Sequence, residues 1–261
     1  MVEKINVHIT NDCNFDCEVC FEKKDLENPC YLDKDKLLAF IKDAKPMHVG
    51  FVGGEPLMHP NINEILKELR IMKIDTCLVT NGELLATLTE LPNSVSIGID
   101  NDDQVEVDKF LATKPECNIE ITITPTDITK IDALIKKYKE YKINVSALAF
   151  WDKRPAVMDY INDEYIEKLV EVSKLENVTL FGENNEHYLR MFYAKYIPKD
   201  VEFECIAPLN IYSDGHLEWC DLENYPTEMT IEKYDFSTLT KPKFVMKEQC
   251  KSCNLRRALC L

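Results

Sequence analysis

The chain has 261 residues, which is enough for one large domain or for one domain with a small extension. Hydrophobic residues make up 45% of the chain, so a packed core is expected and intrinsic disorder is excluded, and no run approaches the roughly 18 apolar residues that indicate a membrane span. The formal net charge of −15 opposes nonspecific binding to nucleic acid or anionic lipid, and the amino terminus lacks the apolar region of a signal peptide, so we expect a cytoplasmic protein that binds neither nucleic acid nor membranes.

Strand and helix patterns alternate along the first part of the chain. Strands are predicted at residues 5–10, 47–52, 76–80, 94–99, 118–124 and 143–150. Helices are predicted at residues 33–44, with Asp33 as the N-cap, and at 62–72, 83–91, 103–113 and 127–141. This alternation predicts an α/β fold of βαβ units with a parallel sheet, which right-handed crossovers either curl into an open barrel or wind onto a flat sheet. In both arrangements the functional loops lie at the carboxyl ends of the strands.

The pattern changes towards the carboxyl end of the chain. Two further helices are predicted at residues 163–175 and 184–195, after which cysteines, aromatic residues and loop residues dominate. We place a domain boundary near Pro198, which separates a core domain, residues 1–198, from a small cysteine-rich extension of hairpin and helix, residues 199–261. Within the extension, Asp214-Gly215 lies between two apolar runs and predicts a β-hairpin.

The 11 cysteines fall mainly into two groups, one at each end of the chain. Because no export signal is present, these groups indicate metal or iron–sulfur sites rather than disulfides. Cys13, Cys17 and Cys20 form C-x3-C-x2-C in the loop after the first predicted strand. Three thiolates on one loop can hold three irons of a 4Fe–4S cluster and leave the fourth iron open to another ligand. The spacing alone also allows a structural zinc site, with Cys30 as a recruited fourth ligand.

The carboxyl ends of the next predicted strands carry glycine-rich or polar turns. The second strand is followed by the Gly-Gly-Glu-Pro motif, which consists of Gly53, Gly54, Glu55 and Pro56. The glycines let the backbone approach a ligand closely, and the glutamate can accept hydrogen bonds from an ammonium group. The third strand leads to Asn81 and the fourth to Asp100. Because these turns follow successive strands, we expect them to lie at the same edge of the sheet.

With these motifs the sequence resembles the radical S-adenosylmethionine (SAM) enzymes over residues 1–150. The resemblance implies that the three early cysteines ligate a 4Fe–4S cluster whose open iron binds the amino and carboxylate groups of SAM. It also implies that the Gly-Gly-Glu-Pro motif holds the methionine amino group and, more loosely, that Asn81 and Asp100 contact the methionyl or ribose part. One departure is Val19, which stands where family members usually carry an aromatic residue.

The resemblance also implies a fold and a chemistry. The fold is a partial (β/α)6 barrel of the TIM type whose open side admits a large substrate. The chemistry is reductive cleavage of SAM to a 5′-deoxyadenosyl radical, which abstracts a hydrogen atom from the substrate. The electron comes from a donor such as flavodoxin or ferredoxin.

The second cysteine group lies in the extension. Its spacing is C-x9-G-x4-C followed by C-x2-C-x6-C, and its members are Cys205, Cys220, Cys250, Cys253 and Cys260. A hairpin and a C-x2-C pair supply four thiolates, enough to close a zinc or an iron–sulfur site. The pattern resembles the SPASM extension of radical SAM enzymes or its shortened "twitch" form, which implies one auxiliary 4Fe–4S cluster on the first four of these cysteines. Cys260 then replaces one ligand, faces the substrate or stays unligated.

Three hypotheses for the function follow. The first is a radical SAM enzyme that oxidatively modifies a peptide by crosslinking, dehydrogenation or epimerisation, with Cys30 and Cys117 as candidate catalytic hydrogen-atom donors, as some family epimerases require. The second is the same chemistry on a small alcohol, sugar or aminocyclitol. The third is a zinc-binding interaction protein without catalysis.

Overall fold

The computed structural model describes residues 2–17, 20, 28–99, 104–123, 128–145, 162–180, 203–205, 208–219, 225–239 and 256–258. These residues belong to two compact units. The first unit consists of Met1–Ile97, Gln104–Ile119 and Pro208–Pro242. The second unit consists of Gly98–Asp103, Glu120–Ala207 and Lys243–Leu261. In the described part of the chain, no helix is both long and apolar enough to span a membrane.

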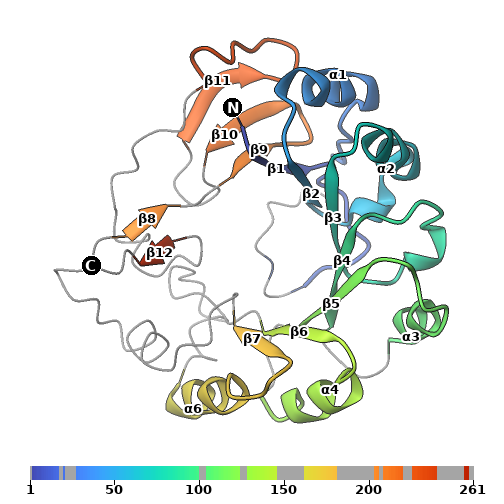
Figure 1. Cartoon of the computed structure of the whole chain (residues 1–261), viewed down its shortest axis with the longest axis vertical. Helices are drawn as coiled ribbons and strands as arrows, with labels where there is room; N and C mark the ends of the chain where they lie inside the picture. The colour runs from blue at the N-terminus through green and yellow to red at the C-terminus, as the bar shows by residue number, and fades with distance from the viewer. Residues whose placement is uncertain are drawn as a thin grey trace. The chain divides into compact units, whose positions relative to one another are not determined.

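The first unit is built on a mostly parallel sheet (Figure 1). Its strands are β1 (Lys4–His8), β2 (His48–Val52), β3 (Asp75–Thr80), β4 (Ser94–Ile99, whose last two residues belong to the second unit), β9 (Leu209–Ile211), β10 (His216–Trp219) and β11 (Tyr225–Thr230). Their order is β11-β10-β9-β1-β2-β3-β4, with parallel pairs from β9 to β4 and antiparallel pairs among β9, β10 and β11. The hairpin predicted at Asp214-Gly215 is therefore confirmed, and Gly215 takes the positive φ of 89° that its turn requires.

The helices of the first unit follow the predicted order. They are α1 (Lys34–Ala44), α2 (Ile62–Ile71) and α3 (Val105–Ala112), with short 3₁₀ turns η1 (Pro56–Met58) and η2 (Leu85–Thr87). Asp33 is confirmed as the N-cap of α1, where its side chain accepts a hydrogen bond of 2.9 Å from the backbone N–H of Lys36.

The helix predicted at residues 83–91 is wrong, because only the turn η2 forms there. The side chain of Asn63 on α2 competes for the backbone of this segment. Its amide donates to the carbonyl of Thr87, and its oxygen accepts from the backbone N–H groups of Thr89 and Glu90 at 2.7 and 3.0 Å. Backbone groups bonded to a side chain in this way are not available for a continuing helix.

The second unit repeats the strand–helix alternation. Its elements are β5 (Asn118–Ile123), whose first two residues belong to the first unit, and α4 (Ile131–Lys137), β6 (Lys142–Val145), α6 (Asp163–Val172), β7 (Val178–Leu180), β8 (Phe203–Cys205) and β12 (Arg256–Ala258). Strands β5, β6 and β7 are parallel, whereas β8 and β12 form a separate antiparallel pair. The sequence did not predict β7, and the helix predicted at residues 184–195 lies outside the described residues.

The predicted fold class is confirmed: the chain has an α/β fold with a mostly parallel sheet, as in partial TIM barrels, and an antiparallel hairpin extension. The hairpin strands β9, β10 and β11 belong to the first unit, and β9 pairs with β1. The domain boundary near Pro198 stays a prediction.

Apolar side chains on one face of the first unit's sheet form the core. In register across six strands they are Leu217, Ile211, Val7, Phe51, Leu78 and Val95, each at most 1% exposed. Helices α1 and α2 bury apolar residues of their own, such as Phe40 and Leu69. Phe40 also contacts the ring of Tyr234, with ring centroids 4.8 Å apart, which joins α1 to the segment after β11. The core thus includes residues from both ends of the chain.

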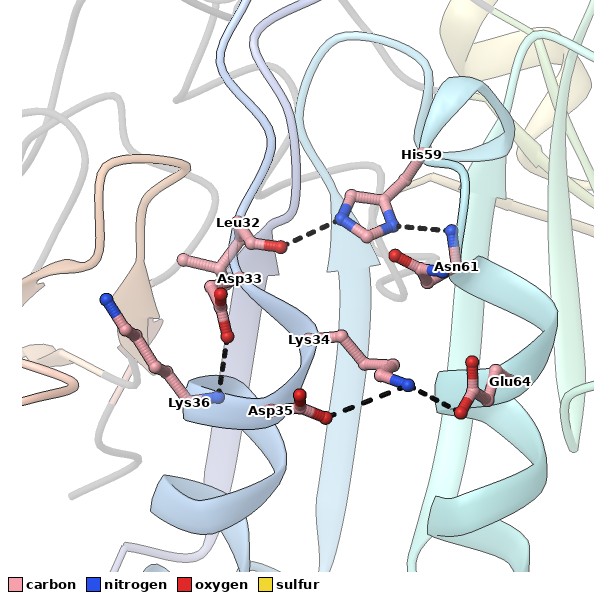
Figure 2. Close-up of polar contacts among 8 residues, drawn as sticks. All are labelled: Leu32, Asp33, Lys34, Asp35, Lys36, His59, Asn61 and Glu64. Atoms are coloured by element: carbon pink, nitrogen blue, oxygen red, sulfur yellow. Dashed lines mark hydrogen bonds and ion pairs between the residues drawn. The ribbon is translucent and has the colours of Figure 1, made fainter.

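His59 connects the starts of α1 and α2 (Figure 2). It is 3% exposed, its Nε2 atom bonds the carbonyl oxygen of Leu32 at 2.9 Å, and its Nδ1 atom accepts from the backbone N–H of Asn61 at 3.2 Å. This pattern requires a neutral ring with the proton on Nε2. Burial lowers the pKa of His59, although the bond to Leu32 opposes the shift.

The stability of the protein should therefore fall as the solution becomes acidic below the ordinary histidine pKa of about 6.5. Since the folded state holds the pKa of His59 below that value, the unfolded chain binds more protons there, and stability rises with pH across this window. His59→Gln should be less stable than the native protein at neutral pH and should lose part of this pH dependence. Urea unfolding midpoints at about pH 5 and 7 measure both effects. The matched control His48→Gln changes an exposed histidine and so separates the effect of burial at His59 from the loss of a histidine as such. Equal slopes in all three proteins would contradict the prediction.

Candidate functional site

The early cysteine loop is attached to the loop after β2 by backbone hydrogen bonds. The N–H of Gly54 donates to the carbonyl of Thr10 at 2.8 Å, and the N–H of Glu55 donates to the carbonyl of Asp12 at 2.7 Å. These bonds continue the pairing of β1 and β2 past the ends of both strands. The C-x3-C-x2-C motif therefore begins directly beside the Gly-Gly-Glu-Pro motif, at the carboxyl edge of the sheet.

Both glycines of the motif are required by this close approach. Gly53 has a φ of +119°, and a Cβ atom there would lie 2.5 Å from the carbonyl oxygen of Thr10. A Cβ atom at Gly54 would lie 1.9 Å from the carbonyl oxygen of Asp12. Any side chain at either position would push the cysteine loop away from β2.

Glu55 holds the ends of β2 and β3 together. Its carboxylate is 1% exposed and accepts from the backbone N–H of Leu57 at 3.0 Å, from Oγ1 of Thr80 at 2.8 Å and from the backbone N–H of Asn81 at 2.8 Å. Burial raises the pKa of Glu55, whereas these three bonds favour the charged form and oppose the rise. A carboxylate has about four acceptor positions, so one remains for a further donor such as an ammonium group.

Asn81 links β3 to the cysteine loop. Its side-chain amide donates to Oδ1 of Asn14 at 2.8 Å, and Asn14 follows Cys13 directly. Its side-chain oxygen accepts from the N–H of Glu83 at 3.1 Å, which shapes the turn. The structure thus brings together the cysteine loop, the Gly-Gly-Glu-Pro motif and Asn81.

The three early cysteines fit an iron–sulfur cluster in the chemistry of their side chains. Cys17 is exposed, and Cys13 and Cys20 are partly exposed. Among the described residues, no three Cys, His, Asp or Glu side chains surround a common metal position. The loop therefore supplies the donor set and accessible thiols without already arranging them around one centre.

Cys30 and Cys117 lie at different edges. Cys30 flanks the cysteine loop, because its carbonyl accepts from Oγ1 of Thr10 at 2.8 Å and its N–H donates to Oδ1 of Asn11 at 2.6 Å. The thiol of Cys30 donates to the carbonyl of Ser213 at 3.3 Å. Cys117 lies at the amino end of β5, the opposite edge, where burial raises the pKa of its thiol. Only Cys30 is therefore brought near the other candidate residues.

Most of the remaining candidates lie outside the described residues. These are Asp100, Cys220, Cys250, Cys253 and Cys260. The backbone of Cys205 is described, and in the β8–β12 pair Cys205 is in register with Arg256. Arg256 stands between Cys253 and Cys260 in the sequence.

Sequence reasoning missed Thr10 as a residue of the site. Thr10 is 1% exposed, and its Oγ1 accepts from the N–H of Asp12 at 3.0 Å while donating to the carbonyl of Cys30. It therefore joins both ends of the cysteine loop. The available signal was a threonine directly after a strand and before the motif, a position where its hydroxyl can bond to nearby backbone groups.

Comparison with known families agrees with the geometry of the cysteine loop and the Gly-Gly-Glu-Pro motif. The radical SAM superfamily matches residues 7–172, and the chain belongs to this superfamily. It is thus a radical SAM enzyme, a class that uses a 4Fe–4S cluster and SAM.

Among related sequences is the probable GTP 3′,8-cyclase of Pyrococcus abyssi, which is 24% identical over 79% of this chain and 67% of that protein. An S-adenosylmethionine-dependent nucleotide dehydratase of Flammeovirga pacifica is 30% identical over 33% of this chain and 32% of that protein. The chain thus spans about two thirds of the first relative and a third of the second.

Among solved structures, anSMEcpe with bound AdoMet and Cp18Cys peptide matches with a TM-score of 0.60 and 16% identity, over 97% of this chain and 87% of that chain. Streptococcus suis SuiB bound to S-adenosylmethionine matches with a TM-score of 0.58 and 16% identity, over 88% of this chain and 63% of that chain. At these identities the likeness shows that the fold is shared.

Gly54→Ala should prevent the cluster from assembling on the early cysteine loop. The added methyl group would overlap the carbonyl oxygen of Asp12, so the loop must move. After anaerobic reconstitution we expect the variant to hold about four fewer irons per chain than the native protein, since one cubane is lost. In the control Gly50→Ala, the methyl group meets only the side-chain oxygen of Asn6, at 3.1 Å, and the iron content should stay native. A native iron content in Gly54→Ala would contradict the prediction.

Glu55→Gln should destabilise the folded protein. The substitution replaces one acceptor oxygen with an NH₂ group that faces a donor, so at least one bond from Leu57, Thr80 or Asn81 is lost. We expect the free energy of unfolding to fall by about 1–3 kcal/mol, measured by urea unfolding. Glu83→Gln, at an exposed position of the same turn, is the matched control and should change stability little. The expectation fails if both variants unfold at the native midpoint.

Proposed function

We propose that the chain reductively cleaves SAM to a 5′-deoxyadenosyl radical and oxidatively modifies a peptide by crosslinking, dehydrogenation or epimerisation. The observation that carries the proposal is the junction of the cysteine loop with the Gly-Gly-Glu-Pro motif at the carboxyl edge of the sheet. Cys13, Cys17 and Cys20 would hold the cluster, which supplies one electron to SAM when bound.

The chain's own residues bind and orient SAM in this proposal. Glu55 offers its remaining acceptor position to the methionine ammonium group, and its burial keeps competing water away. Gly53 and Gly54 allow the backbone to pass close to the ligand. Asn81 keeps the turn after β3 against the cysteine loop. The predicted contact of Asp100 with SAM is part of the same proposal.

We further propose an auxiliary 4Fe–4S cluster on Cys205, Cys220, Cys250 and Cys253. The β8–β12 register supports it, because it pairs Cys205 with Arg256, which stands between Cys253 and Cys260 in the sequence. Such a cluster would take up the electron that remains after hydrogen abstraction, which makes the overall change an oxidation. Cys260 would replace one of these ligands, face the substrate or stay unligated.

Two candidate substrates have separate support. The peptide is favoured by the likeness to anSMEcpe, whose structure holds a peptide and which matches over 97% of this chain. A nucleotide is favoured by the relatives named GTP 3′,8-cyclase and nucleotide dehydratase. In an epimerisation, the thiol of Cys30 would return a hydrogen atom to the substrate radical, and the thiyl radical left on Cys30 would regain the thiol by taking one electron from the donor and a proton from solvent. The place of Cys30 beside the cysteine loop supports that role.

Anaerobic reconstitution should give about eight irons per chain, corresponding to two cubanes, and should give 5′-deoxyadenosine when SAM and a reductant are added. Replacing the three early cysteines with alanine should abolish 5′-deoxyadenosine and leave about four irons. Cys205→Ala should keep the SAM-binding cluster and lose the auxiliary one. Iron analysis and chromatography of the nucleoside products measure these outcomes.

The possible results separate the hypotheses. Bound zinc without 5′-deoxyadenosine after full reconstitution would sink the proposed function and favour the zinc-binding interaction protein. A count of about four irons in the native protein would remove the auxiliary cluster alone. A precursor peptide encoded beside the gene would favour the peptide, and a sugar or aminocyclitol pathway there would favour a small alcohol.

A further inference from the structure

One face of the first unit's sheet carries a row of polar or small residues, which we call the polar layer. In register across six neighbouring strands from β10 to β4, its members are Glu218, Asn210, Asn6, Gly50, Cys77 and Ser94. Since successive side chains of a strand point to opposite faces, the layer lies opposite the apolar row of the core. A row with no large apolar side chain across six strands is not built to pack against a hydrophobic core.

Asn210 is the unusual member of this layer. Its side chain is fully buried at 0% exposure, yet neither its Oδ1 nor its Nδ2 atom has a hydrogen-bond partner in the described structure. A buried amide without partners costs about 1–3 kcal/mol, and native proteins hold few such groups. An amide that is kept at this cost and points to a polar face is suited to a ligand that supplies both a donor and an acceptor, and such a ligand reaches it when the groups that cover its two polar atoms move aside.

The layer also has room for such a ligand above Gly50. A Cβ atom built on Gly50 would meet, among the described residues, only Oδ1 of Asn6 within 4 Å, at 3.1 Å. Asn6, Cys77 and Ser94 are partly exposed. The space therefore opens along the face of the sheet, with the Asn6 amide on one side and the Cys77 thiol on the other.

Stacked rings cover the layer on the side of the carboxyl edge. His8 and Tyr212 lie two residues beyond Asn6 and Asn210 on the same face, and their rings stack with centroids 4.5 Å apart and an interplanar angle of 15°. The ring of His216 stacks on Tyr212 at 4.3 Å and 3°. These stacked rings lie towards the carboxyl edge from the layer, whereas above Gly50 the described residues place only Oδ1 of Asn6 within 4 Å of a methyl group built there, so we expect a ligand to enter above Gly50.

The chemistry of the layer selects for one kind of ligand group. It contains no lysine or arginine, and its one charged member is the carboxylate of Glu218, so it offers no cationic partner to a phosphate or carboxylate. Amides at Asn6 and Asn210 both donate and accept, and Glu218 accepts. A neutral planar amide, with an N–H donor beside a carbonyl acceptor, complements these groups.

We propose that the polar layer is the substrate-recognition site and that it binds a neutral amide group of the substrate, with the buried Asn210 amide as its specificity-determining residue. The assignment of this group to the substrate rests on the proposed function. A peptide group and the lactam edge of guanine share this chemistry, so the test distinguishes these two sources.

The first test measures the thermal stability of the reconstituted protein without substrate. Asn210→Leu replaces an unpaired amide with an apolar side chain of similar size, so Tm should rise by about 2–4 °C. The matched control is Asn93→Leu, because Oδ1 of Asn93 accepts from the N–H of Thr76 at 2.9 Å and from its hydroxyl at 3.1 Å. Tm should fall in that variant. A comparable fall in Asn210→Leu would show a structural role and overturn the proposal.

The second test measures binding through the rise in Tm on adding N-acetylglycinamide, GTP, ATP or inorganic phosphate. The proposal expects N-acetylglycinamide or GTP to stabilise the native protein and to lose that effect in Asn210→Leu. Stabilisation by N-acetylglycinamide indicates a peptide, and stabilisation by GTP but not ATP indicates guanine. Equal stabilisation of both proteins, stabilisation by phosphate alone, or none by any probe overturns the proposal.

The formation of 5′-deoxyadenosine, assayed on the same preparations, separates the two proposals. If the native protein forms no 5′-deoxyadenosine, the proposed function fails, while the Tm results still decide whether the polar layer binds an amide.

Discussion

The buried carboxylate of Glu55 is the interaction on which the candidate site depends. Glu55 follows β2, yet its side chain accepts from the hydroxyl of Thr80 and the N–H of Asn81 at the end of β3, and its own N–H donates to the loop after β1. One residue therefore fixes the relative positions of three successive strand ends. Its burial disfavours the charge that these bonds favour, so the carboxylate is held only while all its donors are in place. The neighbouring glycines make this arrangement possible by letting the cysteine loop approach.

The two faces of the first unit's sheet have different roles: one face packs the core that stabilises the fold, and the other carries the layer that we propose binds the substrate. The row from Leu217 to Val95 is apolar and buried, whereas the polar layer from Glu218 to Ser94 lies one residue along on the same six strands. The alternation of side chains along a strand is enough to produce this division. The same strands that bury the core thus deliver the cysteine loop at their ends and present amides on their other face.

Much of the fold could be predicted from the sequence because its signals are local. The cap at Asp33, the turn at Asp214-Gly215 and the strands that lead into the site all depend on residues close together in the chain. The helix predicted at residues 83–91 failed because Asn63, on another helix, takes its backbone groups. Strand β7 has only three residues, too few for periodicity to show. The pairing of β9 with β1 joins residues about 200 positions apart, so no local pattern in the sequence predicts it. The full width of the polar layer depends on this pairing and could not be predicted either.

The pairing of β1 with β9 also has a consequence for the order in which the protein is made. Ile5 lies beside Leu209, so the first strand leaves the ribosome long before its second neighbour exists. Until then β1 has one unpaired edge. The strand that becomes central in the finished sheet is therefore an edge strand of the unfinished one. The early cysteine loop emerges in this interval, together with the Gly-Gly-Glu-Pro turn that positions it. The early cysteine loop can therefore bind iron when it already pairs with the loop after β2 and only about half of the strands are present. Strands β9, β10 and β11, from the last quarter of the chain, add to the sheet afterwards.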